Sequence, residues 1–368
     1  MRDPHGFFMS PAYGEAHLVT DCPRFHWRKS DRQSTSRTSI STFHFSTNSS
    51  WSLVMRPFLA FCCAISFAVL LVTPSALGQD EGSERLRSLL KATPDLALES
   101  TEVAVDPSIT LVGISSVAAD QQENLYVIHR PDAGDPIVEL DRSGHLVRSW
   151  GRGMFHVPHS IRIDATGAIW AIDANTSMIY KFTPQGKKLL EINVGGVPDA
   201  AQEFCGATDI AFANSGHLFV TDGYCNARVI EYDANGKKLK EWGSHGSGPG
   251  EFQLVHSIAI GPNGNIYVAD RENGRIQWFD QRGKFLGQWK YGGQLHSLAF
   301  TKSGDLYAVL HPKGVAPEKE SYLVKIDLST GTLIGKYPVR SHELGIAPDG
   351  TLLPATRSNQ LLLLKQRQ

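Results

Sequence analysis

One pattern of alternating hydrophobic and polar positions occurs six times along the chain. Each copy has a short alternating segment, a glycine-containing turn and a second segment rich in Val, Ile and aromatic residues. A third such segment then leads through another turn to a fourth. The copies cover 115–130, 159–173, 208–222, 256–270, 296–310 and 342–356, and their starts lie about 40 to 50 residues apart. Because a helical repeat would show helical apolar spacing, the alternation predicts an all-β fold, a six-bladed β-propeller over residues 101–368.

The sixth repeat is short of strands after QLLLLK, near the C-terminal end. We expect residues 101–113, TEVAVDPSITLVG, to supply its outer strand and close the ring. Before them, the interval 79–100 is predicted to be a linker with a short helix at LRSLLKA, residues 86–92.

The N-terminal part of the chain has a different composition. Residues 1–54 are rich in Ser, Thr, Arg and His without sustained periodicity, so we expect a mis-called or disordered extension. From Met55, an arginine, an apolar run over Phe58–Val72 and small residues up to Gly78 predict a signal peptide over 55–78. A membrane span is the alternative, but a run of roughly 15 residues is short for a bilayer. The sequence therefore predicts a secreted or periplasmic protein with no stable membrane span after cleavage.

Overall composition is that of an ordinary globular protein. The 368 residues are 41% hydrophobic and 20% charged with a net charge of −1, which does not favour nucleic acid as a partner. Three of the five cysteines, Cys22, Cys62 and Cys63, precede the repeats. The remaining pair, Cys205 and Cys225, lies in two neighbouring predicted loops. In an exported protein these two are expected to form a disulfide, and two buried free thiols are the alternative.

Histidines recur at the start of the predicted inner strands, beside one rim of the central channel. The six repeats begin with Ser115, His159, Thr208, His256, His296 and His342. Repeats 2, 4 and 6 lie one third of a turn apart, so His159, His256 and His342 are expected to meet on the axis. Three imidazoles with an open fourth position are the ligands of a catalytic zinc. The alternative is that the histidines only cap strands. For His296 the sequence leaves three roles open: a fourth metal ligand, a residue that contacts the ligands but not the metal, or a channel histidine with no role.

The corners that follow the second strand of each repeat carry a second set of candidates. The first, third and fourth repeats place Arg130, Tyr224 and Arg271 there. A tyrosine titrates near pH 10 and is a poor base, but neighbouring guanidinium groups and a divalent cation would lower its pKa. Tyr224 is therefore a candidate general base, held in place by a disulfide at its neighbour Cys225. The alternative is that the arginines only pair with the repeated aspartates.

Several phrases resemble a known family. PHSI, FCGATDIAF, VTDGYCNARV, GSGPGEFQLVHSIAI and VADRENGRIQWFD are similar to NHL repeats and, more narrowly, to peptidyl-α-hydroxyglycine α-amidating lyase, over roughly residues 110–360. The resemblance implies zinc on the three histidines, Tyr224 as the base, and Arg130 and Arg271 as its assistants. It also implies a structural calcium in the channel, held by the backbone carbonyls of Val117 and Ile161 and by the carboxylate of Glu343.

The activity implied is cleavage of the N–Cα bond of a carbinolamide to a primary amide and glyoxylate. Its substrate would come from a possible separate hydroxylase. The sequence departs from the family at Glu343, where an aspartate is usual, at Tyr267 and Trp278, where animal members have a second disulfide, and at Arg340, where a methionine is common. Two competing predictions remain. One is a non-enzymatic NHL propeller that binds a protein or glycan ligand in the periplasm or outside the cell. The other is a calcium-dependent lactonase or esterase, whose acidic site the inner histidines do not match.

Overall fold

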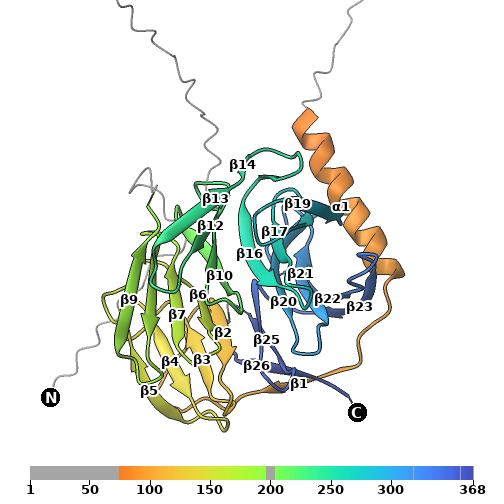
Figure 1. Cartoon of the computed structure of the whole chain (residues 1–368). Coiled ribbons are helices and arrows are strands. Elements are labelled where there is room, and N and C mark those ends of the chain that lie inside the picture. The colour runs from red at the N-terminus through yellow and green to blue at the C-terminus, as the bar shows by residue number, and fades with distance from the viewer. Residues whose placement is uncertain (1–73, 196–203, 318, 357, 368) are drawn as a thin grey trace, which may run out of the picture. The chain divides into compact units, whose positions relative to one another are not determined.

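Six antiparallel four-stranded sheets make up the fold (Figure 1). The computed structural model describes residues 74–195, 204–317, 319–356 and 358–367, with the side chains described from residue 81. The predicted extension 1–54 lies outside these residues, as does the predicted signal peptide except for its last residues. Within the described part of the chain, no helix combines the length and the apolar character needed to span a bilayer.

Each sheet is one blade, and its strands follow in chain order from the inside outward, except in the last blade. The first blade contains β2 (Ser116–Ala119), β3 (Leu125–Ile128), β4 (Ile137–Leu140) and β5 (Leu146–Trp150). The second contains β6 (Pro158–Ile163), β7 (Ile169–Asp173), β8 (Met178–Phe182) and β9 (Lys188–Asn193). The third contains β10 (Ala207–Phe212), β11 (Leu218–Asp222), β12 (Arg228–Tyr232) and β13 (Lys238–Trp242).

The other three blades complete the ring. The fourth contains β16 (Val255–Ile260), β17 (Ile266–Asp270), β18 (Arg275–Phe279) and β19 (Phe285–Lys290). The fifth contains β20 (Gln294–Phe300), β21 (Leu306–His311), β22 (Tyr322–Ile326) and β23 (Leu333–Pro338). The sixth contains β24 (Glu343–Ile346), β25 (Leu352–Ala355), β26 (Leu362–Gln366) and β1 (Leu98–Glu102). A short parallel pair, β14 (Ser244–His245) and β15 (Glu251–Phe252), precedes the fourth blade. The prediction of six blades is confirmed.

The N-terminal strand closes the ring, as predicted, but from an earlier segment. Strand β1 (Leu98–Glu102) pairs antiparallel with β26, so only its last two residues belong to the predicted interval 101–113. Leu98 is its only buried residue, so the strand lacks the alternating pattern that would reveal it. Pro107 has no N–H to donate to a neighbouring strand, which disfavours the later segment as an edge strand.

The hydrophobic core lies between the blades. Six clusters of buried side chains each join two neighbouring sheets, and the inner strands contact one another in order around the ring, with β24 against β2. The helix α1 (Pro74–Ala92) is longer than the predicted 86–92 and adds Leu86 and Leu90 to the cluster between the fourth and fifth blades. Because every blade is fixed by two neighbours, the inner strands form a rigid frame for the side chains at the axis.

Four of the inner strands carry a β-bulge near their start. The register shifts between Pro158 and Ser160 in β6, and at the equivalent places in β10, β16 and β20. The residues within the shifts are His159, Thr208, His256 and His296. A bulge leaves one residue without a ladder partner and re-aims its side chain. The address shared by His159, His256 and His296 is therefore a repeated backbone irregularity, whereas His342 precedes β24, which pairs with β25 without a register shift.

Candidate metal centre

Three histidines from alternate blades converge at the axis. His159 lies in β6, His256 in β16 and His342 directly before β24, and all three are buried. One nitrogen from each ring lies within 4.8 Å of those of the other two. The ring centroids are 5.3, 5.4 and 4.7 Å apart. The convergence expected from the sequence is thus present.

Backbone carbonyls orient two of the three rings. The Nδ1–H of His159 donates to the carbonyl oxygen of Thr208 at 2.9 Å, and that of His256 donates to the carbonyl oxygen of His296 at 2.7 Å. Each bond assigns the proton to Nδ1 and leaves the Nε2 lone pair available to a cation. A protonated Nδ1 held by a carbonyl, with Nε2 toward the axis, is the arrangement of zinc-ligating histidines, so the donor set fits zinc.

His296 contributes to this centre in two ways. Its carbonyl oxygen fixes His256, and its ring lies 5.0 Å from those of His256 and His342, centroid to centroid. It also lies 4.3 Å from the ring of His311, a residue that sequence reasoning gave no role.

The hydroxyl of Tyr224 lies at the open side of the tripod. Its oxygen is 2.9 Å from His159 Nε2 and 3.1 Å from His256 Nε2. Three features hold the corner that carries it. Gly223 packs so closely on strand β16 that a Cβ there would lie 1.8 Å from the carbonyl oxygen of Val255. The ring of Phe204 lies 5.0 Å from the tyrosine ring.

The third feature is the disulfide between Cys205 and Cys225, whose Cα atoms are 4.7 Å apart. It confirms the predicted pairing. It also joins the residue after Tyr224 to the residue after Phe204, so the covalent bond and the ring contact act on the same two segments. The tyrosine is therefore held by the backbone on both sides.

The two candidate arginines have different surroundings. Arg130 donates from Nε to the carbonyl oxygen of Pro158 at 3.1 Å, and its guanidinium carbon lies 5.2 Å from the centre of the Phe204 ring. Phe204 thus lies between Arg130 and Tyr224. Arg271 donates from Nε to Glu272 at 2.8 Å. The arginines that bond to the repeated Asp222 and Asp270 are Arg228 and Arg275.

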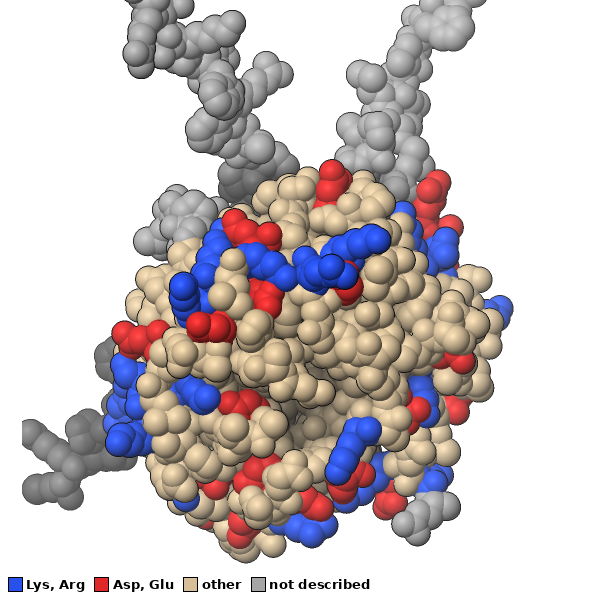
Figure 2. All heavy atoms as spheres, viewed as in Figure 1, with Lys and Arg blue, Asp and Glu red and all other residues tan. Residues whose placement is uncertain are grey.

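A pocket of about 380 Å³ opens beside the histidines. Its lining includes Arg271, Gln294, His296, His311, Val315 and Pro317. Burial lowers the pKa of the His311 imidazole, and the nearby Arg271 lowers it further, so His311 is neutral at pH 7. A hollow of about 700 Å³ lies at the other end of the inner strands, among turn residues 301–305 and 348–351. On the face seen in Figure 2, acidic and basic residues are interspersed around a central hollow.

An arginine side chain bonds to two of the groups that were expected to hold calcium. Arg162 donates from Nη1 to the carbonyl oxygen of Ile161 at 3.0 Å and from Nη2 to Glu343 at 3.2 Å. The third expected ligand, the carbonyl of Val117, lies against Gly345, where a Cβ would approach it to 2.0 Å. With a guanidinium bonded to two of the three expected ligands, these residues do not fit a calcium ion.

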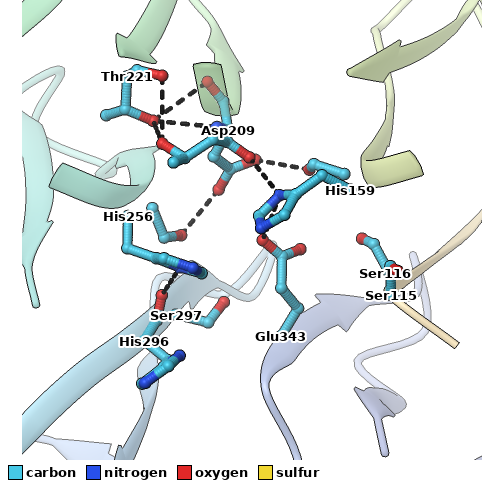
Figure 3. A network of polar contacts seen from close by, with 12 residues as sticks. Ser115, Ser116, His159, Asp209, Thr221, His256, His296, Ser297 and Glu343 are labelled. Carbon is cyan, nitrogen blue, oxygen red and sulfur yellow. Dashed lines mark hydrogen bonds and ion pairs between the residues drawn. The ribbon is translucent and has the colours of Figure 1, made fainter. Parts of the chain in front are cut away.

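Sequence reasoning missed Arg162 and its second carboxylate partner, Asp209. Both Asp209 and Glu343, which Figure 3 shows near His159, are fully buried. Arg162 Nη2 lies 3.0 Å from Asp209 Oδ2. Burial alone would lower the pKa of the Arg162 guanidinium, but the two carboxylates outweigh it and hold that pKa above its usual value. Burial raises the pKa of the Glu343 carboxyl to about 8, and Arg162 opposes that rise.

A signal for this cluster is present in the repeat alignment. Three positions after the inner-strand start, the six repeats carry Ala118, Arg162, Ala211, Ala259, Ala299 and Gly345. An arginine at a position that otherwise holds only alanine or glycine marks a special contact.

Comparison with known proteins supports the fold and gives the family relationship. A family profile for the NHL repeat matches residues 252–279. The mouse peptidyl-glycine alpha-amidating monooxygenase is 31% identical over 281 residues, which cover 65% of this chain and 29% of that protein. A probable peptidyl-alpha-hydroxyglycine alpha-amidating lyase of Caenorhabditis elegans is 30% identical over 230 residues, covering 59% and 65% of the two chains. The peptidyl-alpha-hydroxyglycine alpha-amidating lyase 2 of Drosophila melanogaster is 33% identical over 191 residues, covering 48% and 46%.

The chain is a homologue of the peptidyl-alpha-hydroxyglycine alpha-amidating lyases. It spans 29% of the length of the mouse and rat monooxygenases that it matches, so its relationship is to one part of those proteins. Among solved structures, a streptogramin B lyase matches 73% of this chain and 98% of its own with a TM-score of 0.55 at 14% identity. At that identity the match shows the fold alone. This lyase homologue is therefore an NHL-repeat β-propeller related to enzymes named for peptide amidation.

Proposed function

We propose that this protein is an exported, zinc-dependent lyase that cleaves the N–Cα bond of peptidyl-α-hydroxyglycine-like carbinolamides, releasing a primary amide and glyoxylate. The observation that carries the proposal is the buried histidine tripod with the Tyr224 hydroxyl 2.9 and 3.1 Å from two of its Nε2 atoms. The substrate class in this proposal, a peptide that ends in α-hydroxyglycine, is supported by the names of the relatives.

The metal ligands in this proposal are His159, His256 and His342. A zinc ion bound there would supply positive charge and Lewis acidity to a substrate hydroxyl. The carbonyl oxygens of Thr208 and His296 keep Nδ1 protonated in two of the ligands, so their Nε2 atoms need no further proton loss before binding.

Proton transfer is assigned to Tyr224. The reaction removes the hydroxyl proton of the carbinolamide, forms the carbonyl of glyoxylate as the C–N bond breaks, and returns a proton to the amide nitrogen. The Tyr224 oxygen lies within hydrogen-bond distance of two ligand Nε2 atoms, beside the place where the metal would be held. The charge of a bound zinc would favour the phenolate form of Tyr224, which then accepts the first proton. The neighbouring Phe204 ring and the disulfide at Cys225 fix its position.

Positive charge for the substrate carboxylate is assigned to the two arginines. Arg271 lines the pocket beside His296 and is oriented by Glu272, which also accepts a hydrogen bond from Gln294 at 2.6 Å. Arg130 is oriented by Pro158 and Phe204. A guanidinium binds a planar carboxylate through two parallel N–H groups, which suits a substrate with a terminal carboxylate.

The test is glyoxylate release from α-hydroxyhippurate by the zinc-loaded protein. Tyr224→Phe removes only the hydroxyl, and we expect kcat to fall by about 10²- to 10⁴-fold with zinc retained. Tyr180→Phe is the matched control, because the hydroxyl of Tyr180 donates to the backbone of Met154 in the second blade, outside the candidate site. Equal activity in Tyr224→Phe and wild type would remove the proposed base.

A second outcome would favour a different function. The chain is also 26% identical over 239 residues to the human NHL repeat-containing protein 3, which covers 61% of this chain. If the protein binds no zinc and releases no glyoxylate, a non-enzymatic NHL propeller becomes the better description. The separate hydroxylase that would supply the substrate stays a prediction.

A further inference from the structure

The guanidinium of Arg162 joins four blades beneath the histidine tripod. It donates to Ser116 Oγ at 2.9 Å, to the carbonyl oxygen of its own neighbour Ile161, and to Asp209 and Glu343. These partners belong to the first, second, third and sixth blades. The arginine side chain is 17% exposed, while both carboxylates are fully buried.

A belt of polar side chains extends these contacts around the channel (Figure 3). Directly after the inner-strand start, the six repeats carry Ser116, Ser160, Asp209, Ser257, Ser297 and Glu343. Asp209 accepts hydrogen bonds from Ser160 Oγ at 3.0 Å and from Ser257 Oγ at 2.7 Å. Ser297 Oγ accepts from the backbone N–H of Leu344 at 3.1 Å. The belt therefore links neighbouring blades through side chains next to the candidate ligands.

Each metal ligand is adjacent to a member of this belt. Ser160 follows His159, Ser257 follows His256, and Glu343 follows His342. In addition, Asp209 follows Thr208, whose carbonyl oxygen accepts the Nδ1–H of His159. A change in the belt would therefore move the ligands themselves.

The buried carboxyl groups of Asp209 and Glu343 need hydrogen-bond donors or a cation. A buried carboxylate without a partner is strongly unfavourable, and oxygen atoms gathered from several strands are also the ligands that Ca²⁺ prefers. Arg162 already donates to the oxygens of Ile161, Asp209 and Glu343, and its positive charge repels a second cation at the same place. The position is special to one repeat, because the other five have alanine or glycine there.

We propose that the Arg162 guanidinium serves as the built-in cation of the channel, so that this protein holds its histidine tripod without calcium. Arg162 is then a positioning residue: it acts on the ligands through Asp209 and Glu343 and does not touch the substrate. This goes beyond the proposed function, since it concerns how the centre is held together and would stand if the substrate were different.

The experiment compares calcium content, thermal unfolding and zinc affinity of the zinc-loaded protein with those of two variants. Arg162→Ala removes the guanidinium. Arg148→Ala is the matched control, because Arg148 pairs with a carboxylate of Glu139, at 2.8 Å, on the outer strands of the first blade. Each protein is stripped of metal with EGTA, freed of the chelator and reloaded with one equivalent of zinc. It is then unfolded thermally in calcium-free buffer and in millimolar CaCl2, and zinc affinity is measured by competition with a chromogenic chelator.

For wild type we expect no stoichiometric calcium and the same Tm in both buffers. The Tm of Arg162→Ala should be lower by about 5 °C or more in calcium-free buffer, and its zinc binding about tenfold weaker, because two buried carboxyl groups lose their hydrogen-bond donor. Calcium should restore part of both losses in this variant alone, since its unoccupied oxygens can then bind the ion. Arg148→Ala should not respond to calcium.

Three results would overturn the proposal. The first is wild type that contains about one calcium per chain as purified and is less stable in calcium-free buffer than in CaCl2. The second is an Arg162→Ala variant as stable as wild type. The third is a destabilised variant that calcium does not restore, which would make Arg162 an ordinary structural arginine. If Arg162→Ala does not fold without calcium, the wild-type measurements and folding of the variant in CaCl2 decide the question. None of these measurements uses lyase activity, so they test the role of Arg162 independently of the proposed reaction.

Discussion

Gly223 should be the most sensitive small residue near the candidate site. A Cβ at this position would lie 1.8 Å from the carbonyl oxygen of Val255, whereas real Cβ atoms stay at least 3.0 Å from such atoms. Gly223→Ala therefore requires the corner before Tyr224 or the start of β16 to move by about 1.2 Å. The backbone of Gly223 does not have a positive φ, so the effect is steric and not conformational.

This displacement falls on two candidate functional groups at once. Tyr224 follows Gly223, and His256 follows Val255. The oxygen of Val255 also accepts a hydrogen bond from Thr208 Oγ1 at 2.9 Å, which limits its freedom to move. A misplacement of about 1 Å between reacting groups costs on the order of 10²-fold in rate, so we expect kcat to fall about 100-fold. Overpacking should lower the free energy of unfolding by about 1–3 kcal/mol.

The assay is glyoxylate release at saturating α-hydroxyhippurate, with thermal unfolding and zinc content measured on the same samples. Gly248→Ala is the matched control, because its Cβ would meet only the flexible carboxylate end of Glu251, at 3.0 Å. A Gly223→Ala variant with the kcat and Tm of wild type would refute the reasoning, since it would show that the corner can shift without moving Tyr224 or His256.

Two further predictions concern stability. Replacing Cys205 and Cys225 by serine opens a loop that the disulfide closes across a sequence separation of 20. This should lower the free energy of unfolding by about 3 kcal/mol and Tm by about 5 to 10 °C, as measured by calorimetry. An unchanged Tm would show that packing alone holds the corner. Burial lowers the pKa of His129 from 6.5, and its Nδ1 accepts the backbone N–H of Val112 at 3.2 Å, so the folded protein binds fewer protons here than the unfolded chain. The free energy of unfolding should therefore fall as the pH drops from 6.5 through the lowered pKa, by at most about 1.4 kcal/mol per pH unit from this group. Denaturant titrations between pH 5 and 7.5 measure this dependence. The prediction is wrong if the free energy of unfolding of His129→Gln changes with pH as steeply as that of wild type.

Much of the fold could be predicted because it repeats. The same alternation occurs six times, so noise in one copy is corrected by the others, and the number of blades follows directly. Helix α1 and strand β1 have no such repetition. The apolar residues of α1 identify only its last turns, where Leu86 and Leu90 are buried, and β1 is an edge strand with a single buried residue.

In the candidate site, too, the residues at repeated positions could be predicted and the others could not. His159, His256 and His342 occupy one address in alternate repeats, so their convergence could be predicted from symmetry. The pairing of Cys205 with Cys225 was also predicted, and it is present. The partners of Arg162 could not be found in this way, because they lie 47 and 181 residues away and differ in type from repeat to repeat.

By itself, then, the sequence determined the number of blades, the histidines that face the axis and the disulfide, since each depends on a repeated local pattern or on the simple count of available residues. Only the tertiary structure decided which side chain bonds to the buried carboxyl groups of Asp209 and Glu343. That choice depends on distances across the channel between side chains from different blades, and local patterns carry no information about such distances. For this reason the bonds from Arg162 to Ile161 and Glu343, two of the expected calcium ligands, could not be predicted from the sequence.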